Sequence, residues 1–531
     1  MRSEVIRIYK IVHTWTGILA GMALFIAFYA GALTMFKPEL EEWASPPSAA
    51  ASASIAEAPA LLAHAFRTDP DAAKALRLSL APAPVDRIAW RVSEPGADDH
   101  DELSVRHFTV TASGVTEVPR THIGELIDVL HRVVGLPVDG DETRLFMGVI
   151  AALYGLAILS GLIILLPSLV KDLFAFRVGK NLKRMWLDAH NVVGLFSLPF
   201  HVVMAITATV FAFHDGIYAV QDRMIHDGKL AVAFQRSTPP NPKPRDPATM
   251  LPPAEIIAKV TTVAPEFEPT MLEYLQATGP RASVRVWGDD PRGLGFRPLG
   301  GFALVDPYSG KMISTDFLPG HGTKASSFLT AIFALHFGTY GGGLVKWGYF
   351  LLGLLGAWLF YSGNLLWIET RRKKAKKTDP SLPHQPRNTR LMASATVGIC
   401  LGAVAGISVA IVSSKWLPGH VADPNAWTRA LYYAVFFASI AWSFARGGSR
   451  ALVDMLRVAA VATFAIPATS LGGALVPSLG PWMRHDAIGV DLTALVLGLV
   501  FLRIARAARK RAHDGPRDSV WAIDLRAPVS S

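Results

Sequence analysis

Five histidines stand in apolar surroundings, where ionisable side chains are rare. His13, His190, His201 and His336 lie in predicted apolar segments, and His131 lies just before one. An ionisable side chain within a membrane-spanning segment is costly to bury and marks a candidate functional site. Taken singly, each could be a core imidazole hydrogen-bonded to a neighbouring carbonyl. Taken together, they indicate a shared cofactor.

Haem iron is the partner that suits these residue types. Imidazole is neutral when it ligates iron, and the Leu, Phe and Gly residues around the histidines suit the face of a porphyrin. The single cysteine, Cys400, excludes an intramolecular disulfide, an iron–sulfur ligand set and a cysteine-based zinc site. Because two histidines on one iron leave no open coordination position, the predicted chemistry is electron transfer rather than oxygen activation. We expect two haems, and no catalytic acid or base stands out.

Depth along the predicted helices sorts the histidines into two levels. His13 and His190 lie near the cytoplasmic ends of their helices and form the predicted inner pair. His201 is eleven residues beyond His190, which returns it to the same helix face and raises it by about 16 Å. His131 and His336 lie toward the opposite surface. Any two of His131, His201 and His336 could ligate an outer haem; we favour His336, with His131 and His201 competing for the other position.

The composition requires a membrane to hold these segments. Of 531 residues, 51% are hydrophobic and 18% are charged, against about 25% charged residues in soluble domains. Several apolar runs reach the length of about 20 residues that a membrane span needs. We predict eight spanning helices, near 11–36, 145–167, 187–213, 330–368, 391–413, 428–445, 453–475 and 487–505.

The position of the basic residues predicts orientation. Lys and Arg outnumber Asp and Glu by 52 to 42, and basic clusters directly follow apolar runs. Cytoplasmic loops of membrane proteins carry such an excess. We therefore predict a multi-pass membrane protein with both termini in the cytoplasm. Its partner is lipid rather than nucleic acid.

Two long hydrophilic insertions, 37–143 and 214–329, fall on the extracytoplasmic side in this scheme. Each shows one helix followed by strands, which indicates a repeated α+β module. The first has a helix near 55–66 and strands near 76–80, 86–92 and 105–111; the second has a helix near 253–263 and strands near 271–277, 282–287 and 302–305.

The predicted organisation therefore has eight parts. In chain order they are helix 1 at 1–36, a first module at 37–143, helices 2 and 3 at 145–213, a second module at 214–329, helix 4 at 330–368, a basic cytoplasmic linker at 369–390, four C-terminal helices at 391–507 and a cytoplasmic tail at 508–531. The four C-terminal helices have no histidine in their apolar runs, and we interpret them as an extension of the bundle.

Over roughly residues 1–375 the sequence resembles the PepSY-associated transmembrane family, whose members include iron-regulated and siderophore-reductase membrane proteins. The matching pieces are Val12-His13-Thr14-Trp15-Thr16-Gly17, Leu130-His131-Arg132, Ser160-Gly161, Trp186-Leu187-Asp188-Ala189-His190-Asn191, Leu198-Pro199-Phe200-His201, Leu335-His336-Phe337-Gly338 and Ser362-Gly363. The resemblance implies a four-helix core with b-type haems and two extracytoplasmic PepSY-like modules.

The resemblance also implies an oxidoreductase. Such a ferric-siderophore reductase passes electrons across the inner membrane and releases iron as Fe(II), with a quinol or a cytoplasmic reductase as donor. The alternative is a binding or regulatory protein whose modules bind a siderophore or a peptide without redox activity. A transporter would need broken helices or carboxylates at mid-depth, and Pro199 is the one conspicuous helix breaker near a histidine.

Overall fold

A computed structural model describes most of the chain, and the chain forms two compact units. The described residues are 3–46, 55–80, 88–91, 105–111, 114–117, 121–138, 144–169, 182–224, 227–228, 245–291, 293–375 and 383–523. The helical unit consists of Met1–Ala44, Thr121–Phe213 and Phe350–Ser531, and the sheet unit of Ser45–Arg120 and His214–Tyr349. Residues 47–54 and 92–104 of the first insertion and the last residues of the predicted tail, 524–531, lie outside the described residues.

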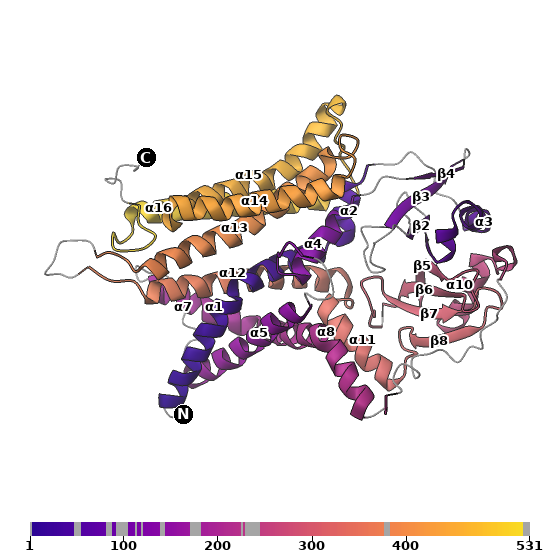
Figure 1. Cartoon of the computed structure of the whole chain (residues 1–531), viewed down its shortest axis with the longest axis horizontal. Helices are drawn as coiled ribbons and strands as arrows, with labels where there is room; N and C mark the ends of the chain where they lie inside the picture. The colour runs from indigo at the N-terminus through magenta and orange to yellow at the C-terminus, as the bar shows by residue number, and fades with distance from the viewer. Residues whose placement is uncertain are drawn as a thin grey trace. The chain divides into compact units, whose positions relative to one another are not determined.

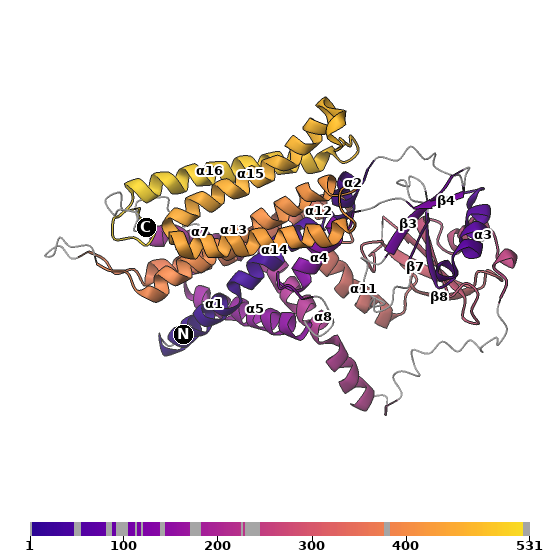
Figure 2. The same cartoon turned by 45° about the horizontal axis from the view of Figure 1, so that its top comes forward.

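Long helices build the helical unit (Figure 1). They are α1 Ser3–Thr34, α2 Lys37–Ala44, α4 Ile123–Arg132, α5 Arg144–Leu165, α7 Leu182–Phe196, α8 Leu198–Met224, α12 Gly342–Thr370, α13 Arg387–Trp416, α14 Pro424–Arg446, α15 Gly448–Leu475 and α16 Ile488–Asp514, with short 3-10 turns at Leu166–Ser168 and Pro477–Leu479. Figures 1 and 2 show α13, α14, α15 and α16 running beside one another as the C-terminal bundle. Helices α8 and α12 begin in one unit and end in the other.

Seven of the described helices are long and apolar enough to span a membrane, one fewer than predicted. They are Glu4–Thr34, Leu145–Leu165, Leu198–Met224, Gly342–Thr370, Arg387–Trp416, Gly448–Leu475 and Ile488–Asp514. The predicted span 428–445 corresponds to α14, whose Arg, Ser and Tyr residues lower its hydropathy. Since an odd number of spans would put the termini on opposite sides, the cytoplasmic placement of both termini stays a prediction.

Two predicted single helices are broken. The segment predicted at 187–213 divides at Ser197 into α7 and α8, because Pro199 has no N–H to donate to the carbonyl four residues back. The segment predicted at 330–368 divides into α11 Lys324–Phe337 and α12. Between them Gly338 and Gly341 adopt φ angles of 67° and 66°, which side chains other than glycine rarely allow. The chain therefore leaves one helix and starts another in a new direction.

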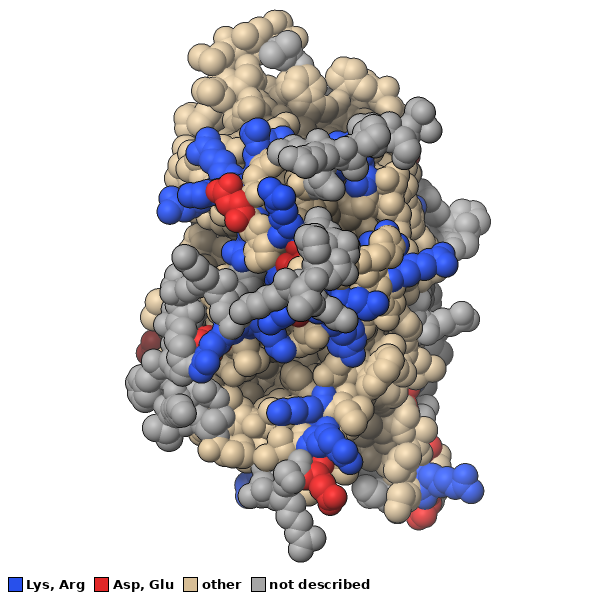
Figure 3. Space-filling model, turned by 90° about the vertical axis from the view of Figure 1, so that its left-hand side faces the viewer, with Lys and Arg blue, Asp and Glu red and all other residues tan. Residues whose placement is uncertain are grey.

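Basic side chains gather on one face of the molecule. Figure 3 shows many Lys and Arg and few Asp and Glu on the side seen from the left of Figure 1. At the basic linker that follows α12, Asp518 accepts from the Arg372 guanidinium and from the Ala375 backbone N–H at 2.9 Å. Residues just beyond α16, which continues to Asp514 rather than ending near 505, are thereby tied to the end of α12.

One antiparallel sheet of eight strands forms the sheet unit. Its elements are α3 Ala58–Thr68, a 3-10 turn Pro70–Ala73, β1 Ala75–Ser79, β2 Ile88–Arg91, β3 Val105–Thr111, β4 Gly114–Glu117, a 3-10 turn Pro247–Thr249, α10 Pro253–Val263, β5 Glu268–Leu275, β6 Ser283–Asp289, β7 Gly301–Val305, β8 Met312–Phe317 and α11. The strand order is β4-β3-β2-β1-β5-β6-β7-β8. Each insertion supplies a helix and a four-strand meander, so the repeated order of elements is present, but both halves share one sheet.

The two halves join where β1 pairs with β5, from Ala75 opposite Leu275 to Ser79 opposite Met271. Alternate strand residues and the apolar faces of α3 and α10 form one core, which includes the fully buried Leu76, Leu272 and Ile256. The sequence analysis missed the edge strands β4 and β8. Both are short, and β8 carries the polar run Ser-Thr-Asp, which obscures the alternation of a half-buried strand.

An ion cluster crosses this join on the other face of the sheet. Glu273 of β5 accepts from Arg77 of β1 and Arg285 of β6, both at 3.1 Å, and from the Trp287 indole at 3.1 Å. Burial raises the pKa of the Glu273 carboxyl, but the two guanidinium groups and the indole outweigh it and leave the pKa below its usual value. The cluster therefore stabilises the folded sheet when Glu273 is ionised.

We predict that Glu273→Gln destabilises the sheet by about 1–3 kcal/mol at pH 7, because both half-exposed arginines lose their partner. The deficit should shrink as the pH falls through the usual carboxyl range toward the lowered pKa of Glu273, because Glu273 of the unsubstituted protein also becomes protonated there. Thermal unfolding of the full chain at pH 7 and at a series of lower pH values measures it. The control is Glu268→Gln, an exposed position of the same strand; a pH-independent deficit would contradict the ionic origin.

Candidate functional site

Four of the five predicted histidines lie in the helical unit, and each binds a neighbouring helix through its Nδ1 atom. The pairs are His13 of α1 with the Ala157 carbonyl of α5 at 2.8 Å, His131 of α4 with the Ala27 carbonyl of α1 at 2.7 Å, His190 of α7 with the Ser362 hydroxyl of α12 at 3.0 Å, and His201 of α8 with the Tyr154 hydroxyl of α5. Each imidazole is thus oriented by a helix other than its own.

Three of these contacts select one tautomer. A carbonyl oxygen only accepts, so Nδ1 of His13 and of His131 carries the proton and donates it. The Ser362 hydroxyl donates to the Leu359 carbonyl at 2.8 Å, which leaves its oxygen to accept from His190 Nδ1. In the neutral form of all three imidazoles, Nε2 is therefore the nitrogen without a proton. This is the form in which histidine ligates a metal.

His13 and His190 lie next to each other. Their ring centroids are 6.4 Å apart and their planes are inclined by 76°. A Cβ atom added to Gly161 of α5 would lie 3.0 Å from His13 Cε1, and one added to Gly363 of α12 would lie 3.6 Å from His190 Cε1. Four helices therefore meet at this pair, and the glycines let α5 and α12 pack closely against the two rings.

His201 occupies an aromatic pocket. It is 2% exposed, and its Nε2 atom is buried without a hydrogen-bond partner among the described residues. The rings of Phe28, Phe200 and Phe360 lie 5.5, 5.7 and 6.3 Å from the imidazole. Because buried polar atoms nearly always have a partner, this nitrogen points to a bound group.

One turn of α1 meets both His131 and His201. Ala27 accepts from His131, a Cβ added to Gly31 would lie 2.8 Å from His131 Nδ1, and Phe28 lies against His201. Ala27 is 14 residues beyond His13, or about 21 Å along the helix. The histidines of the helical unit therefore occupy two levels along α1.

The part of the chain that carries these histidines also matches known proteins. Residues 11–370 match the PepSY-associated TM region. The protein belongs to this PepSY-associated transmembrane family. It is also 25% identical over 374 residues to an uncharacterized protein, PA4219, of Pseudomonas aeruginosa, a match covering 65% of this chain and 86% of that protein. Together with the seven candidate spans, the match describes a multi-pass membrane protein.

The fifth histidine of this family member, His336, belongs to the sheet unit. It lies in the last turn of α11, not at the start of α12 as predicted, and its ring meets Phe337 edge-on at 5.4 Å. The αL conformation of Gly338, which ends α11, explains the difference. The apolar run around His336 continues across this turn, so the sequence alone concealed the break.

The PepSY-associated core contains partners that sequence reasoning missed. No sequence pattern indicates Tyr154 or the carbonyls of Ala27 and Ala157 as partners, because every helix has carbonyls and many have tyrosines. Ser362-Gly363 and Ser160-Gly161 carried a signal, since both belong to the motifs of the resemblance. Within the part of the chain that the structure describes, no three His, Cys, Asp or Glu side chains converge on one metal position.

We predict that Gly31→Ala destabilises the helical unit by about 1–3 kcal/mol, because the new methyl group would overlap the His131 ring and overpack the contact. Gly155→Ala on α5 is the matched control, since a Cβ there meets nothing within 4 Å. Thermal unfolding of both variants in detergent micelles measures the difference. Equal midpoints for the two variants would show that His131 does not need the space at Gly31.

Proposed function

We propose that this protein is a transmembrane electron-transfer protein that holds two b-type haems and reduces ferric siderophores on the extracytoplasmic side. The observation that carries the proposal is the pairing of His13 with His190, each with its Nδ1 atom engaged by another helix. Family membership supports the membrane core of the proposal. Haem, electron transfer and the siderophore substrate are our proposal.

The spacing of the inner pair suits a ligand set for one iron. The ring centroids of His13 and His190 lie 6.4 Å apart, close enough for both imidazoles to hold one iron. Gly161 and Gly363 let α5 and α12 approach the two rings closely.

The outer site rests on His201. Its buried Nε2 atom lacks a partner, and a metal bond would supply one. His131 has the ligating tautomer and meets the same turn of α1. His336 belongs to the sheet unit, and its role as a ligand stays a prediction from the sequence.

The residues of the chain hold and tune these sites. Bound haem supplies one-electron chemistry by cycling between the ferric and ferrous states. The Nδ1 hydrogen bonds to Ala157, Ala27 and Ser362 make each imidazole a stronger electron donor and prevent its rotation. Phe28, Phe200 and Phe360 exclude water around His201.

The proposed reaction moves one electron per iron. Haems held by the inner and outer histidines would supply one-electron transfer from a quinol or a cytoplasmic reductase to a ferric siderophore, whose iron would become Fe(II). Siderophores bind Fe(II) more weakly than Fe(III), so the metal is released. This direction requires the inner-membrane orientation that the basic residues predict.

We expect His190→Ala to lose the inner haem and keep the outer one, which halves the haem-to-protein ratio. Reduced-minus-oxidised spectra of the purified protein measure this ratio. His420→Ala, an exposed histidine outside the family match, is the control and should retain both haems. A purified protein without a redox-sensitive Soret band would refute the proposal. Siderophore binding without haem-dependent electron transfer would favour the binding or regulatory alternative.

We also expect Ser362→Ala to raise the midpoint potential of the inner haem. Losing the acceptor of the His190 Nδ1–H bond makes the imidazole a weaker donor to ferric iron. A hydrogen bond of about 1 kcal/mol corresponds to roughly 40 mV for one electron. Potentiometric titration measures the shift, and Ser362→Thr, which keeps the hydroxyl, should restore the original potential. An unchanged potential in the alanine variant would mean that Ser362 does not tune His190.

A further inference from the structure

The C-terminal bundle lies beyond the region that matches the family. That region ends at residue 370, whereas α13 to α16 occupy residues 387 to 514. The bundle nonetheless packs closely on the family core through α1, α2 and α4. The short helix α4 carries His131, so the contacts of this helix connect the bundle with the histidines.

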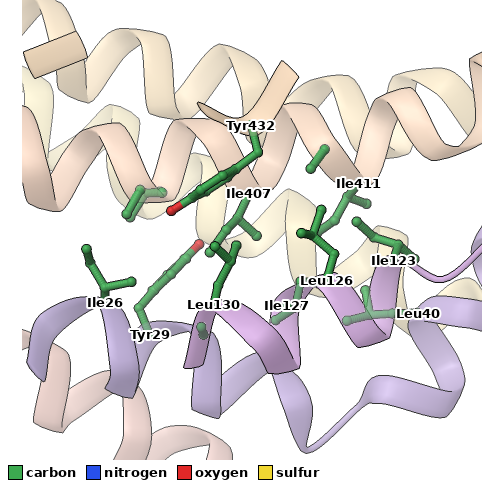
Figure 4. Packing of buried hydrophobic residues seen from close by; sticks show 14 of the residues in the cluster. Ile26, Tyr29, Leu40, Ile123, Leu126, Ile127, Leu130, Ile407, Ile411 and Tyr432 are labelled. Carbon is green, nitrogen blue, oxygen red and sulfur yellow. The ribbon is translucent and has the colours of Figure 1, made fainter. Parts of the chain in front are cut away.

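The apolar face of α4 packs into the bundle. Figure 4 shows Leu126, Ile127 and Leu130 of α4 facing Ile407 and Tyr432 of α13 and α14. Tyr432 is fully buried, and so are Ile127 and Leu130. Burial of these apolar side chains therefore stabilises the packing of α4 on the bundle.

Helix α14 also holds α4 at both of its ends. The Asn425 side-chain oxygen accepts from the His122 backbone N–H at 3.2 Å, just before α4 begins. The Tyr433 hydroxyl donates to the Leu136 carbonyl at 2.7 Å, just after α4 ends. Because the two bonds bracket the helix, they fix its position along its own axis as well as its distance from α14.

A second attachment runs through α2. Trp43 is fully buried, donates to Asp491 of α16 at 2.9 Å, and carries the Lys415 ammonium 3.6 Å from its ring centroid. At the other end of α2, Lys37 pairs with Glu125 of α4. The bundle therefore holds α4 directly and also through α2.

His131 points to the other side, toward α1, where Ala27 accepts its Nδ1–H bond. We infer that the C-terminal bundle is a positioning module that seats α4 against α1 and thereby places His131. Asn425 and Tyr433 are its positioning residues. The inference deepens the proposed function, on which it rests, because it assigns the bundle to the outer haem ligand.

The test uses full-length protein with Asn425→Ala and Tyr433→Phe, singly and combined. Amide hydrogen exchange of residues 123–132 should accelerate about 5-fold for each bond removed, the factor that corresponds to about 1 kcal/mol. In the reduced protein, the displaced imidazole should open an axial position, so carbon monoxide should bind a haem that excludes it in the unsubstituted protein. Tyr308→Phe is the matched control, since it removes an equivalent hydroxyl-to-carbonyl bond, to Ala277 at 2.7 Å, within the sheet.

The outcomes separate the two ideas. Unchanged exchange in the combined variant overturns the positioning module, whatever the haem content. A second outcome is that His131→Ala removes the outer haem, while the Asn425 and Tyr433 variants show faster exchange but bind no carbon monoxide. That outcome overturns the link between the position of α4 and the ligand. If His131→Ala leaves haem content and spectra unchanged, the ligand role of His131 fails, and the exchange experiment alone decides whether the bundle positions α4.

Discussion

The hydrogen bond at Nδ1 of each membrane histidine is the contact on which the proposed electron path depends. An imidazole has two equivalent-looking nitrogens and a freely rotating ring, so by itself it defines neither a ligating atom nor a direction. A carbonyl of a neighbouring helix removes both freedoms at once, because it can only accept. His13 and His131 use such a carbonyl, and His190 uses a serine whose own proton is already donated. Helix packing thus determines which nitrogen is presented.

Helix α1 contacts the histidines of both levels and sets the distance between the levels. It carries His13 near its beginning, and its Ala27–Gly31 turn meets His131 and His201. A straight α-helix of this length is a stiff spacer, so the separation between the levels follows from the number of residues between these contacts. Glycines stand where α1 and α5 approach a ring because no other residue leaves room for an imidazole at that distance.

The sheet unit depends on one pair of strands that its two halves share. A four-stranded meander has two open edges, and an edge strand exposes unpaired backbone groups. Pairing β1 with β5 removes one edge from each half, and the Glu273 cluster crosses this junction. The repeated module therefore reaches its stable form only when both insertions are present in one sheet.

The sequence by itself determined the membrane character and the repeated order of helix and strands. It also identified five histidines in apolar surroundings as candidate site residues. These properties depend on local composition and periodicity, which each segment carries alone. Only the tertiary structure decided that Tyr154 holds the ring of His201, that Ser362 holds the ring of His190, and that His336 ends α11 in the sheet unit. It also placed the C-terminal bundle behind His131. Contacts between residues hundreds of positions apart depend on how helices pack and where a glycine or proline turns the chain, and no local pattern records that.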